Sequence, residues 1–337
     1  MLMSKKIALI GGAGFIGHNL AITLKKKGHE PVIIDNLAIN NMLSFTDSEI
    51  KNRNLYWSLL NQRLELLHMN EININIQDGR NYNALSMLIG KIKPDVIIQL
   101  AAVSHADKSN KDPHTTFDHT LRTLENSLDI AKSLGIHLIY FSSSMAYGNF
   151  NGESVNEEMP CNPIGIYGTL KYAGELIVKA YHEVFGLPYT IIRPSALYGE
   201  RCVSRRVGQI FIEQAVQDRD ITINGSGEEK LDFTYVDDLI QGTILTIEKE
   251  EAKNQTFNLT FGKARSISDM VNILDNYFPK LSINYVPKDN LIPDRGTLNV
   301  DKARHILGYK PQYDLEKGYV KYIEWYKDFY KALKESK

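Results

Sequence analysis

The stretch Ile10-Gly11-Gly12-Ala13-Gly14-Phe15-Ile16-Gly17 carries four glycines, of which Gly11, Gly14 and Gly17 lie at a regular spacing of three residues. An apolar strand is predicted before it (6–9), and apolar residues at every fourth position predict a helix after it (18–27). A strand, a glycine turn and a helix form the context of a dinucleotide-binding loop, in which backbone and helix N–H groups approach a diphosphate. An ordinary strand-to-helix turn is the alternative. We expect the diphosphate contacts to come from Gly11, Gly14, Phe15, Ile16 and Gly17.

The cofactor specificity is predicted by Asp35, which ends a second apolar strand (31–35) 18 residues after Gly17. A carboxylate at this place binds the adenosine ribose hydroxyls and repels a 2′-phosphate, so NAD is expected rather than NADP. Asp78 follows a third strand (73–77) and is expected to receive the adenine amino group. The other contacts to adenine and ribose are expected at the ends of the third and fourth (94–102) strands, from Gly79, Leu100, Ala101 and Ala102.

The candidate reaction centre is Tyr167-Gly168-Thr169-Leu170-Lys171, downstream of a fifth strand (136–142) that runs into three serines. Tyr167 and Lys171 share one face of a predicted helix (167–185). A free tyrosine has a pKa near ~10, and an adjacent ammonium lowers the pKa of the phenol. Tyr167 is therefore predicted to accept the proton of a hydroxyl while a hydride leaves the same carbon. We expect Lys171 also to bind the nicotinamide ribose.

With these motifs, the chain resembles the extended short-chain dehydrogenase/reductase family, in its NAD-dependent nucleotide-sugar epimerase/dehydratase branch. The resemblance spans nearly the whole chain and adds Asp35-Asn36, Arg193-Pro194, Tyr198-Gly199 and the run from Asp232 to Asp238. It implies a Rossmann fold, a nucleotide-sugar substrate oxidised at a ring hydroxyl, most directly at C4, and further cofactor contacts from Asn36 and Pro194. The catalytic serine of epimerases in this branch lies four residues before the tyrosine of a Tyr-Gly pair. That position here is Ser143, with Ser144 as the alternative.

Departures from the family pattern refine the substrate. Dehydratases of this branch carry Asp and Glu where this chain has Ser144 and Met145, which disfavours water elimination. The asparagine and arginine that usually hold the substrate phosphate are replaced by Ala196 and Leu231. Substitutes are expected among Arg201, Arg205, Arg206 and Arg295. Other expected substrate contacts are Ser104, His105, Ser144 and Met145.

Three outcomes stay open at this stage. The enzyme can return the hydride to the opposite face of the keto sugar, which is epimerisation. It can also release the keto sugar, which makes it a C4 dehydrogenase. A non-catalytic NAD-binding protein is the third reading, and the complete Ser, Tyr and Lys set argues against it.

Composition limits the remaining classes. The 337 residues carry a net charge of −1 and no basic cluster interleaved with aromatics, so nucleic acid is not an expected partner. Two cysteines offer no metal-binding spacing, and no metal is expected. No apolar run reaches the roughly 18 residues of a membrane helix, and no signal peptide is predicted. A cytoplasmic protein is therefore expected.

The expected architecture is a doubly wound α/β domain over residues 1–190, with a parallel sheet, followed by a smaller mixed α/β domain over 191–337 that mainly binds substrate. An insertion at 37–77 is predicted to contain a helix (54–68), which either covers the cofactor or lies on the surface without a role. A homodimer is expected from the resemblance. Its four-helix bundle would use the helices at 167–185 and about 116–133 from each protomer.

Overall fold

A computed structural model of the protein describes residues 3–104, 106–150, 152, 154–279, 281–289 and 291–335. Its centre is a seven-stranded sheet in the order β12-β7-β5-β4-β1-β2-β3, in which every strand pair is parallel. The chain proceeds outward from β1 on one side and from β4 on the other, which confirms the doubly wound fold. The strands are β1 (Lys6–Ile10), β2 (Glu30–Asp35), β3 (Ile74–Ile76), β4 (Val96–Gln99), β5 (His137–Phe141), β7 (Tyr189–Arg193) and β12 (Gln255–Asn258).

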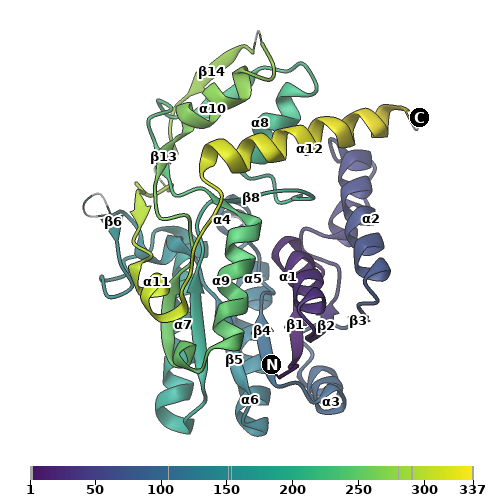
Figure 1. Cartoon of the computed structure of the whole chain (residues 1–337), viewed down its shortest axis with the longest axis vertical. Helices are drawn as coiled ribbons and strands as arrows, with labels where there is room; N and C mark the ends of the chain where they lie inside the picture. The colour runs from purple at the N-terminus through teal and green to yellow at the C-terminus, as the bar shows by residue number, and fades with distance from the viewer. Residues whose placement is uncertain are drawn as a thin grey trace.

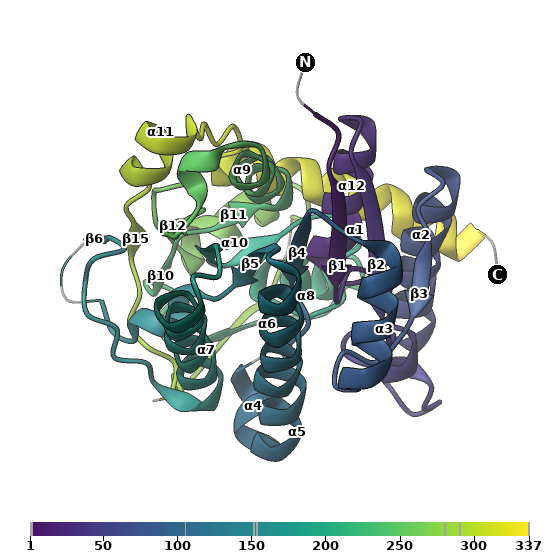
Figure 2. The same cartoon turned by 90° about the horizontal axis from the view of Figure 1, so that it is seen from below.

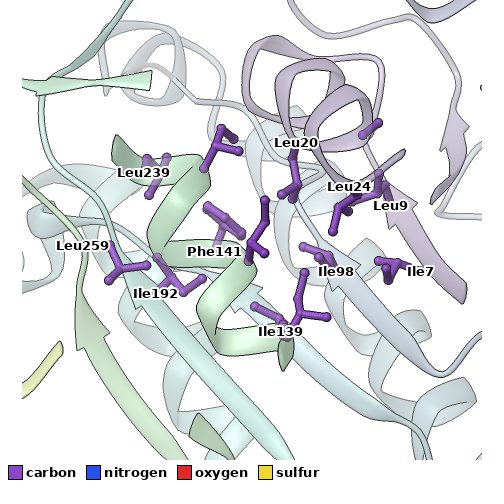
Figure 3. Close-up of a cluster of buried hydrophobic side chains, with 14 of the residues drawn as sticks. Ile7, Leu9, Leu20, Leu24, Ile98, Ile139, Phe141, Ile192, Leu239 and Leu259 are labelled. Atoms are coloured by element: carbon purple, nitrogen blue, oxygen red, sulfur yellow. The ribbon is translucent and has the colours of Figure 1, made fainter. Parts of the chain in front are cut away.

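Helices cover both faces of this sheet (Figures 1 and 2). The strands read as apolar runs because both of their faces are buried. In one core, Leu20 and Leu24 from the first helix and Leu239 from a later one pack against the sheet (Figure 3). The helices of this layer are α1 (Phe15–Lys26), α9 (Val236–Glu248) and α11 (Asp301–Leu307), and those of the other layer are α3 (Tyr82–Ile92), α6 (Thr123–Leu134) and α7 (Gly165–Phe185).

The later half of the chain contributes to both parts of the molecule. Strand β12 and helices α9 and α11 lie beyond residue 190 but complete the sheet and one of its helix layers. The sheet therefore extends past the expected boundary at residue 190. A separate core joins α8 (Val207–Ala215), α10 (Ile267–Asp275), α12 (Leu315–Glu335) and β9 (Ile221–Asn224). The exposed strand β14 (Ile283–Val286) pairs in parallel with β9.

The predicted helix of the insertion forms as α2 (Arg53–Met69). Its apolar face packs into the same core as α8 and α12, and Figure 1 shows it below the C-terminal end of α12. Tyr56 of α2 and Tyr326 of α12 both donate to the buried carboxylate of Glu213 on α8, at 2.9 and 3.2 Å. The insertion thus connects the nucleotide-binding part with the C-terminal part of the chain.

Some element boundaries differ from the sequence prediction. Helix α1 begins at Phe15, three residues earlier than expected, because the backbone is already helical directly after Gly14. The expected helix at about 116–133 is interrupted: α5 (Pro113–Phe117) passes through a π-helical turn, η2 (Asp118–Arg122), into α6. A π-helical turn takes up one more residue than an α-helical turn, so the helix faces before and after it are rotated relative to each other. The sequence prediction assumed an unbroken α-helical period and therefore missed this turn.

Candidate active site

Two adjoining cavities open at the carboxyl ends of the sheet strands. The smaller has a volume of about 130 Å³ and lies over the glycine loop, and the larger has a volume of about 710 Å³ and lies over the serine run. Ligands of doubly wound sheets bind at this edge, where the strand order reverses. The cavities share a wall formed by Ile16, Leu100, Ala102, Ser104, Leu197 and Arg206. A molecule in one cavity can therefore meet a molecule in the other.

The glycine loop leaves room for a diphosphate. Gly11 has a φ of +80°, and a Cβ built on it would lie 2.6 Å from the backbone nitrogen of Ala101. A Cβ on Gly17 would lie 2.4 Å from the carbonyl oxygen of Gly12. At Gly14 a Cβ would meet only one atom, at 3.3 Å, and no side chain caps α1 there. The first turn of α1 thus offers N–H groups to the cavity, as a dinucleotide site requires.

Asp35 lies at the end of β2 in the wall of the smaller cavity. Its two carboxylate oxygens accept hydrogen bonds from the backbone N–H groups of Ala13 (3.0 Å) and Leu37 (2.7 Å). Burial raises the pKa of Asp35, and these two hydrogen bonds oppose that shift. The carboxylate is therefore held rigidly where the ribose of adenosine was expected.

Asp78 also lines the smaller cavity, but its oxygens already have partners. Arg80 binds it through Nη2 at 2.7 Å, and Asn36 donates to it at 3.1 Å. The Arg80 hydrogen bonds lower the pKa of Asp78 to about 2. An adenine amino group would have to share these oxygens. All the other predicted cofactor residues line this cavity except Tyr167, Lys171 and Pro194, which line the larger one.

The serine run forms a turn against α7. Ser143 precedes the short helix η3 (Ser144–Tyr147), and its hydroxyl accepts the N–H of Met145 at 3.2 Å. A Cβ on Gly168 would lie 2.7 Å from the carbonyl oxygen of Met145, so α7 packs directly on this turn. As a result Ser143, Ser144, Met145, Tyr167 and Lys171 all line the larger cavity.

Lys171 is a buried side chain in the wall of the larger cavity. Its Nζ donates to the carbonyl oxygen of Phe141 at 2.7 Å. Burial lowers the pKa of Lys171 to about 7, Arg206 adds to this shift, and Glu175 opposes it. The sequence analysis predicted an ammonium beside Tyr167. In the fold this proton is held weakly, because the side chain has lost its water.

A buried ion pair lies behind Lys171. Glu175, one turn further along α7, accepts from Arg193 Nε at 2.9 Å and from Arg193 Nη2 at 2.6 Å. The hydroxyl of Ser142 donates to the same carboxylate. Both charged side chains are 2% exposed or less, so neither charge is solvated on its own. Ser142 is therefore occupied by this pair, whereas Ser143 and Ser144 remain the hydroxyl candidates for the reaction.

Three predicted arginines line the larger cavity: Arg205, Arg206 and Arg295. The Nε groups of Arg206 and Arg295 are buried and have no acceptor among the residues that the structure describes. Burial, and secondly Arg206, lowers the pKa of Arg295 to about 10, and Tyr167 opposes this shift. These two cations are thus available to an anion. Arg201 is not in either cavity wall and instead lies over the ring of Trp325, 5.4 Å from its centre.

Of the other two predicted substrate contacts, Ser104 and His105, the structure describes only Ser104. Ser104 lines both cavities, and its hydroxyl accepts from Asn40 at 3.0 Å. His105 lies outside the described residues, so its predicted contact stays a prediction.

No group of three His, Cys, Asp or Glu side chains with the arrangement of a metal site occurs in the described part of the chain. The described helices include none that is long and apolar enough to cross a membrane.

Several cavity residues were missed by the sequence analysis. Arg63 lies on the buried face of α2 with Tyr56 and Leu60, and His119 and Thr123 come from the π-helical turn and the start of α6. A charged residue within an otherwise apolar helix face was the available signal for Arg63. The other two depend on the π-helical turn, which the sequence pattern did not reveal.

Comparisons with known proteins agree with this geometry. The sequence profile of the NAD dependent epimerase/dehydratase family matches residues 7–260. A putative UDP-glucose 4-epimerase of Methanocaldococcus jannaschii is 28% identical over 335 residues, covering 96% of this chain and 98% of that protein. A UDP-glucuronate 4-epimerase of Thermodesulfobacterium geofontis is 26% identical over 333 residues, covering 97% and 98%. The crystal structure of UDP-glucuronic acid 4-epimerase from Bacillus cereus with UDP-glucuronic acid and NAD has a TM-score of 0.87 at 26% identity, covering 96% of this chain and 100% of that one.

Proposed function

Because the chain belongs to the NAD dependent epimerase/dehydratase family and NAD is its cofactor, we propose that it is a C4 epimerase of a nucleotide-activated sugar. One observation carries the proposal. Tyr167, Lys171 and Ser143 line a single cavity whose wall is shared with the cavity over the glycine loop. A sugar hydroxyl beside Tyr167 would therefore lie next to the nicotinamide end of a bound cofactor.

The residues have separate tasks in this reaction. When bound, NAD would supply the acceptor for a hydride from the sugar carbon and the donor for its return. Tyr167 takes the proton of the C4 hydroxyl and gives a proton back in the reverse step. Ser143 orients the same oxygen through a hydrogen bond. Lys171, when protonated, stabilises the phenolate of Tyr167, and its place in the cavity wall suits a contact with the nicotinamide ribose.

The unpaired arginines support a substrate with a diphosphate. A buried guanidinium with a free N–H costs free energy until an acceptor pairs with it. Arg206 and Arg295 both present such a group in the larger cavity. We assign them to the diphosphate of the nucleotide sugar, in place of the asparagine and arginine that stand in the family pattern where this chain has Ala196 and Leu231.

The absence of strand-end carboxylates distinguishes this chain from the dehydratases. Ser144 and Met145 stand where elimination needs an acid and a base, and both are buried. Neither side chain carries a proton reversibly near neutral pH. We therefore expect no loss of water from the sugar.

The test is product analysis with a panel of nucleotide sugars that includes UDP-glucose and UDP-glucuronate, followed by NMR and mass spectrometry. Inversion at C4 without change of mass is expected, and Tyr167→Phe should lose roughly 10²–10⁴-fold in turnover while it keeps NAD. Tyr172→Phe, on the same helix but outside both cavity walls, is the matched control. Release of a keto sugar with stoichiometric NADH would replace the epimerase by a C4 dehydrogenase. A product lighter by one water would contradict our conclusion that the enzyme is not a dehydratase.

We also propose a homodimer that packs through α7. Leu176, Val184 and Phe185 on this helix are 50%, 68% and 55% exposed, and Phe117 of α5 is 50% exposed. Most of the apolar residues expected to extend this surface from the second helix are instead buried in the chain's own core: Leu121, Leu124, Leu128 and Ile130. A two-fold interface needs one self-complementary patch, which α7 can supply. Sedimentation of a fully active monomer at micromolar concentration would contradict the proposal.

We place the protein in the cytoplasm. Cys161 and Cys202 are both free thiols, which persist in that reducing compartment. Cell fractionation tests this assignment, and recovery of the protein in an oxidising compartment would overturn it.

A further inference from the structure

Arg63 of the inserted helix α2 is a buried cation with an incomplete set of partners. Its side chain is 1% exposed and belongs to the wall of the smaller cavity. Nε and Nη2 both donate to the carbonyl oxygen of Arg201, at 2.9 and 2.5 Å. Nη1 is buried and finds no acceptor within the described ranges. One edge of the guanidinium is thus anchored to protein, while the Nη1 group is left for something else.

Arg63 stays ionised at neutral pH although it is buried. Burial lowers the pKa of Arg63 to about 10, and Arg201 adds to this, while Cys202 and Asp35 oppose it. A pKa of about 10 leaves the guanidinium charged at neutral pH. The field of Arg63 also reaches the glycine loop. It contributes, after burial, to lowering the pKa of His18, whose ring nitrogen bonds the carbonyl oxygen of Gly14 at 2.9 Å.

The charge of Arg63 therefore acts on both Asp35 and His18, and Arg63 lines the same cavity as Asp35 and the start of α1. Asp35 already receives two backbone N–H groups and does not bond Arg63. A charged donor prefers an anionic acceptor, and a guanidinium suits the oxygens of a phosphate. The first turn of α1 is the place where the fold holds a diphosphate.

We propose that Arg63 is a phosphate ligand of the cofactor, and that Nη1 donates to the diphosphate of NAD. The inserted helix then contributes directly to cofactor binding instead of only packing beside it. The proposal rests on NAD occupying the smaller cavity but not on the epimerase reaction, because it concerns binding alone.

The test measures binding to the full-length chain freed of cofactor, by calorimetry, with NAD, ADP and adenosine as separate probes. Arg63→Met should weaken NAD and ADP by roughly 10- to 100-fold, the usual effect of losing a hydrogen bond to a charged group. Adenosine, which has no phosphate, should bind as it does to the unmodified chain. Arg63→Gln removes the charge but keeps a donor for the Arg201 carbonyl, so it should show the same pattern with less effect on folding.

Tyr56→Phe is the matched control, because it removes a hydrogen bond that docks α2 but lies outside both cavity walls. It should leave NAD affinity unchanged. If Tyr56→Phe lost as much NAD affinity as the Arg63 variants, the loss would come from weaker docking of α2 and not from a contact between Arg63 and the diphosphate. An equal loss of adenosine binding in the Arg63 variants, or unchanged NAD binding in a folded Arg63→Gln, would overturn the phosphate assignment. Failure of the epimerase assay would leave these binding results unaffected.

Discussion

The buried pair of Glu175 and Arg193 allows a quantitative prediction. Replacing Glu175 by Gln keeps the side-chain shape but removes the negative charge. Arg193 then remains as a cation that is 2% exposed and has lost its only charged hydrogen-bond partner among the described residues. Removing one member of a buried pair typically costs about 3–5 kcal/mol. We expect Glu175→Gln to lose this much of its free energy of unfolding.

The assay is urea unfolding at pH 8, followed by far-ultraviolet circular dichroism. Both tryptophans, Trp57 and Trp325, lie in α2 and α12, so their fluorescence reports the C-terminal core separately. The control is Glu250→Gln, which breaks the pair with Lys253 on the surface, where Glu250 is 71% exposed. This control should change the free energy of unfolding by no more than about 1 kcal/mol.

A double-mutant cycle isolates the pair itself. With Arg193→Met added, no unpaired cation remains, so the double variant should be less destabilised than the sum of the single variants by roughly 2–3 kcal/mol. A loss in Glu175→Gln as small as that of the surface control would refute the reasoning. Additive effects of the two substitutions would show that the ion pair is not the source of the stability.

Three other substitutions test the site. Gly11→Ala should lower the free energy of unfolding, measured by thermal melts, by about 1–3 kcal/mol, because Gly11 has a φ of +80° and a Cβ there would lie 2.6 Å from the nitrogen of Ala101. Gly90→Ala is the control: Gly90 has open space around it, so this substitution should leave the stability unchanged or raise it. Lys171 has a folded pKa of about 7, below its ordinary 10.5, so the unfolded chain binds more protons between these values. In urea titrations of the cofactor-free protein, the unmodified chain should therefore gain stability relative to Lys171→Met as the pH rises from about 7 to 10.5, and a constant difference would contradict the pKa. Asp35→Ala should reduce the difference in binding free energy between NAD and NADP, because repulsion between the Asp35 carboxylate and the 2′-phosphate is expected to contribute several kcal/mol to it. Calorimetry measures both affinities. Tighter binding of NADP than of NAD by the unmodified chain would contradict this explanation.

The sequence alone determined the features that depend on short-range spacing. The glycine loop, the apolar strands and the Tyr167/Lys171 spacing each follow from residues within one turn or one strand of each other. The predicted parallel sheet also placed Asp35, Ala101 and Ser143 at strand ends, and parallel strands end at one edge of a sheet. The two cavities contain the described residues of this set.

The tertiary structure decided what depends on neighbours distant in sequence. The pKa of Lys171 reflects burial together with Glu175 and Arg206, and periodicity carries no information on how these side chains meet. The same holds for Arg63, whose partner is the carbonyl oxygen of Arg201 on a loop 138 residues away, and for β12, which joins the sheet beside β7 from the later half of the chain. Burial and electrostatic interactions sum over contacts in space, whereas a sequence pattern records only contacts along the chain. The fold, the kinds of reacting groups and the inserted helix could therefore be predicted, but the protonation of Lys171 and the place of Arg63 in the cofactor cavity could not.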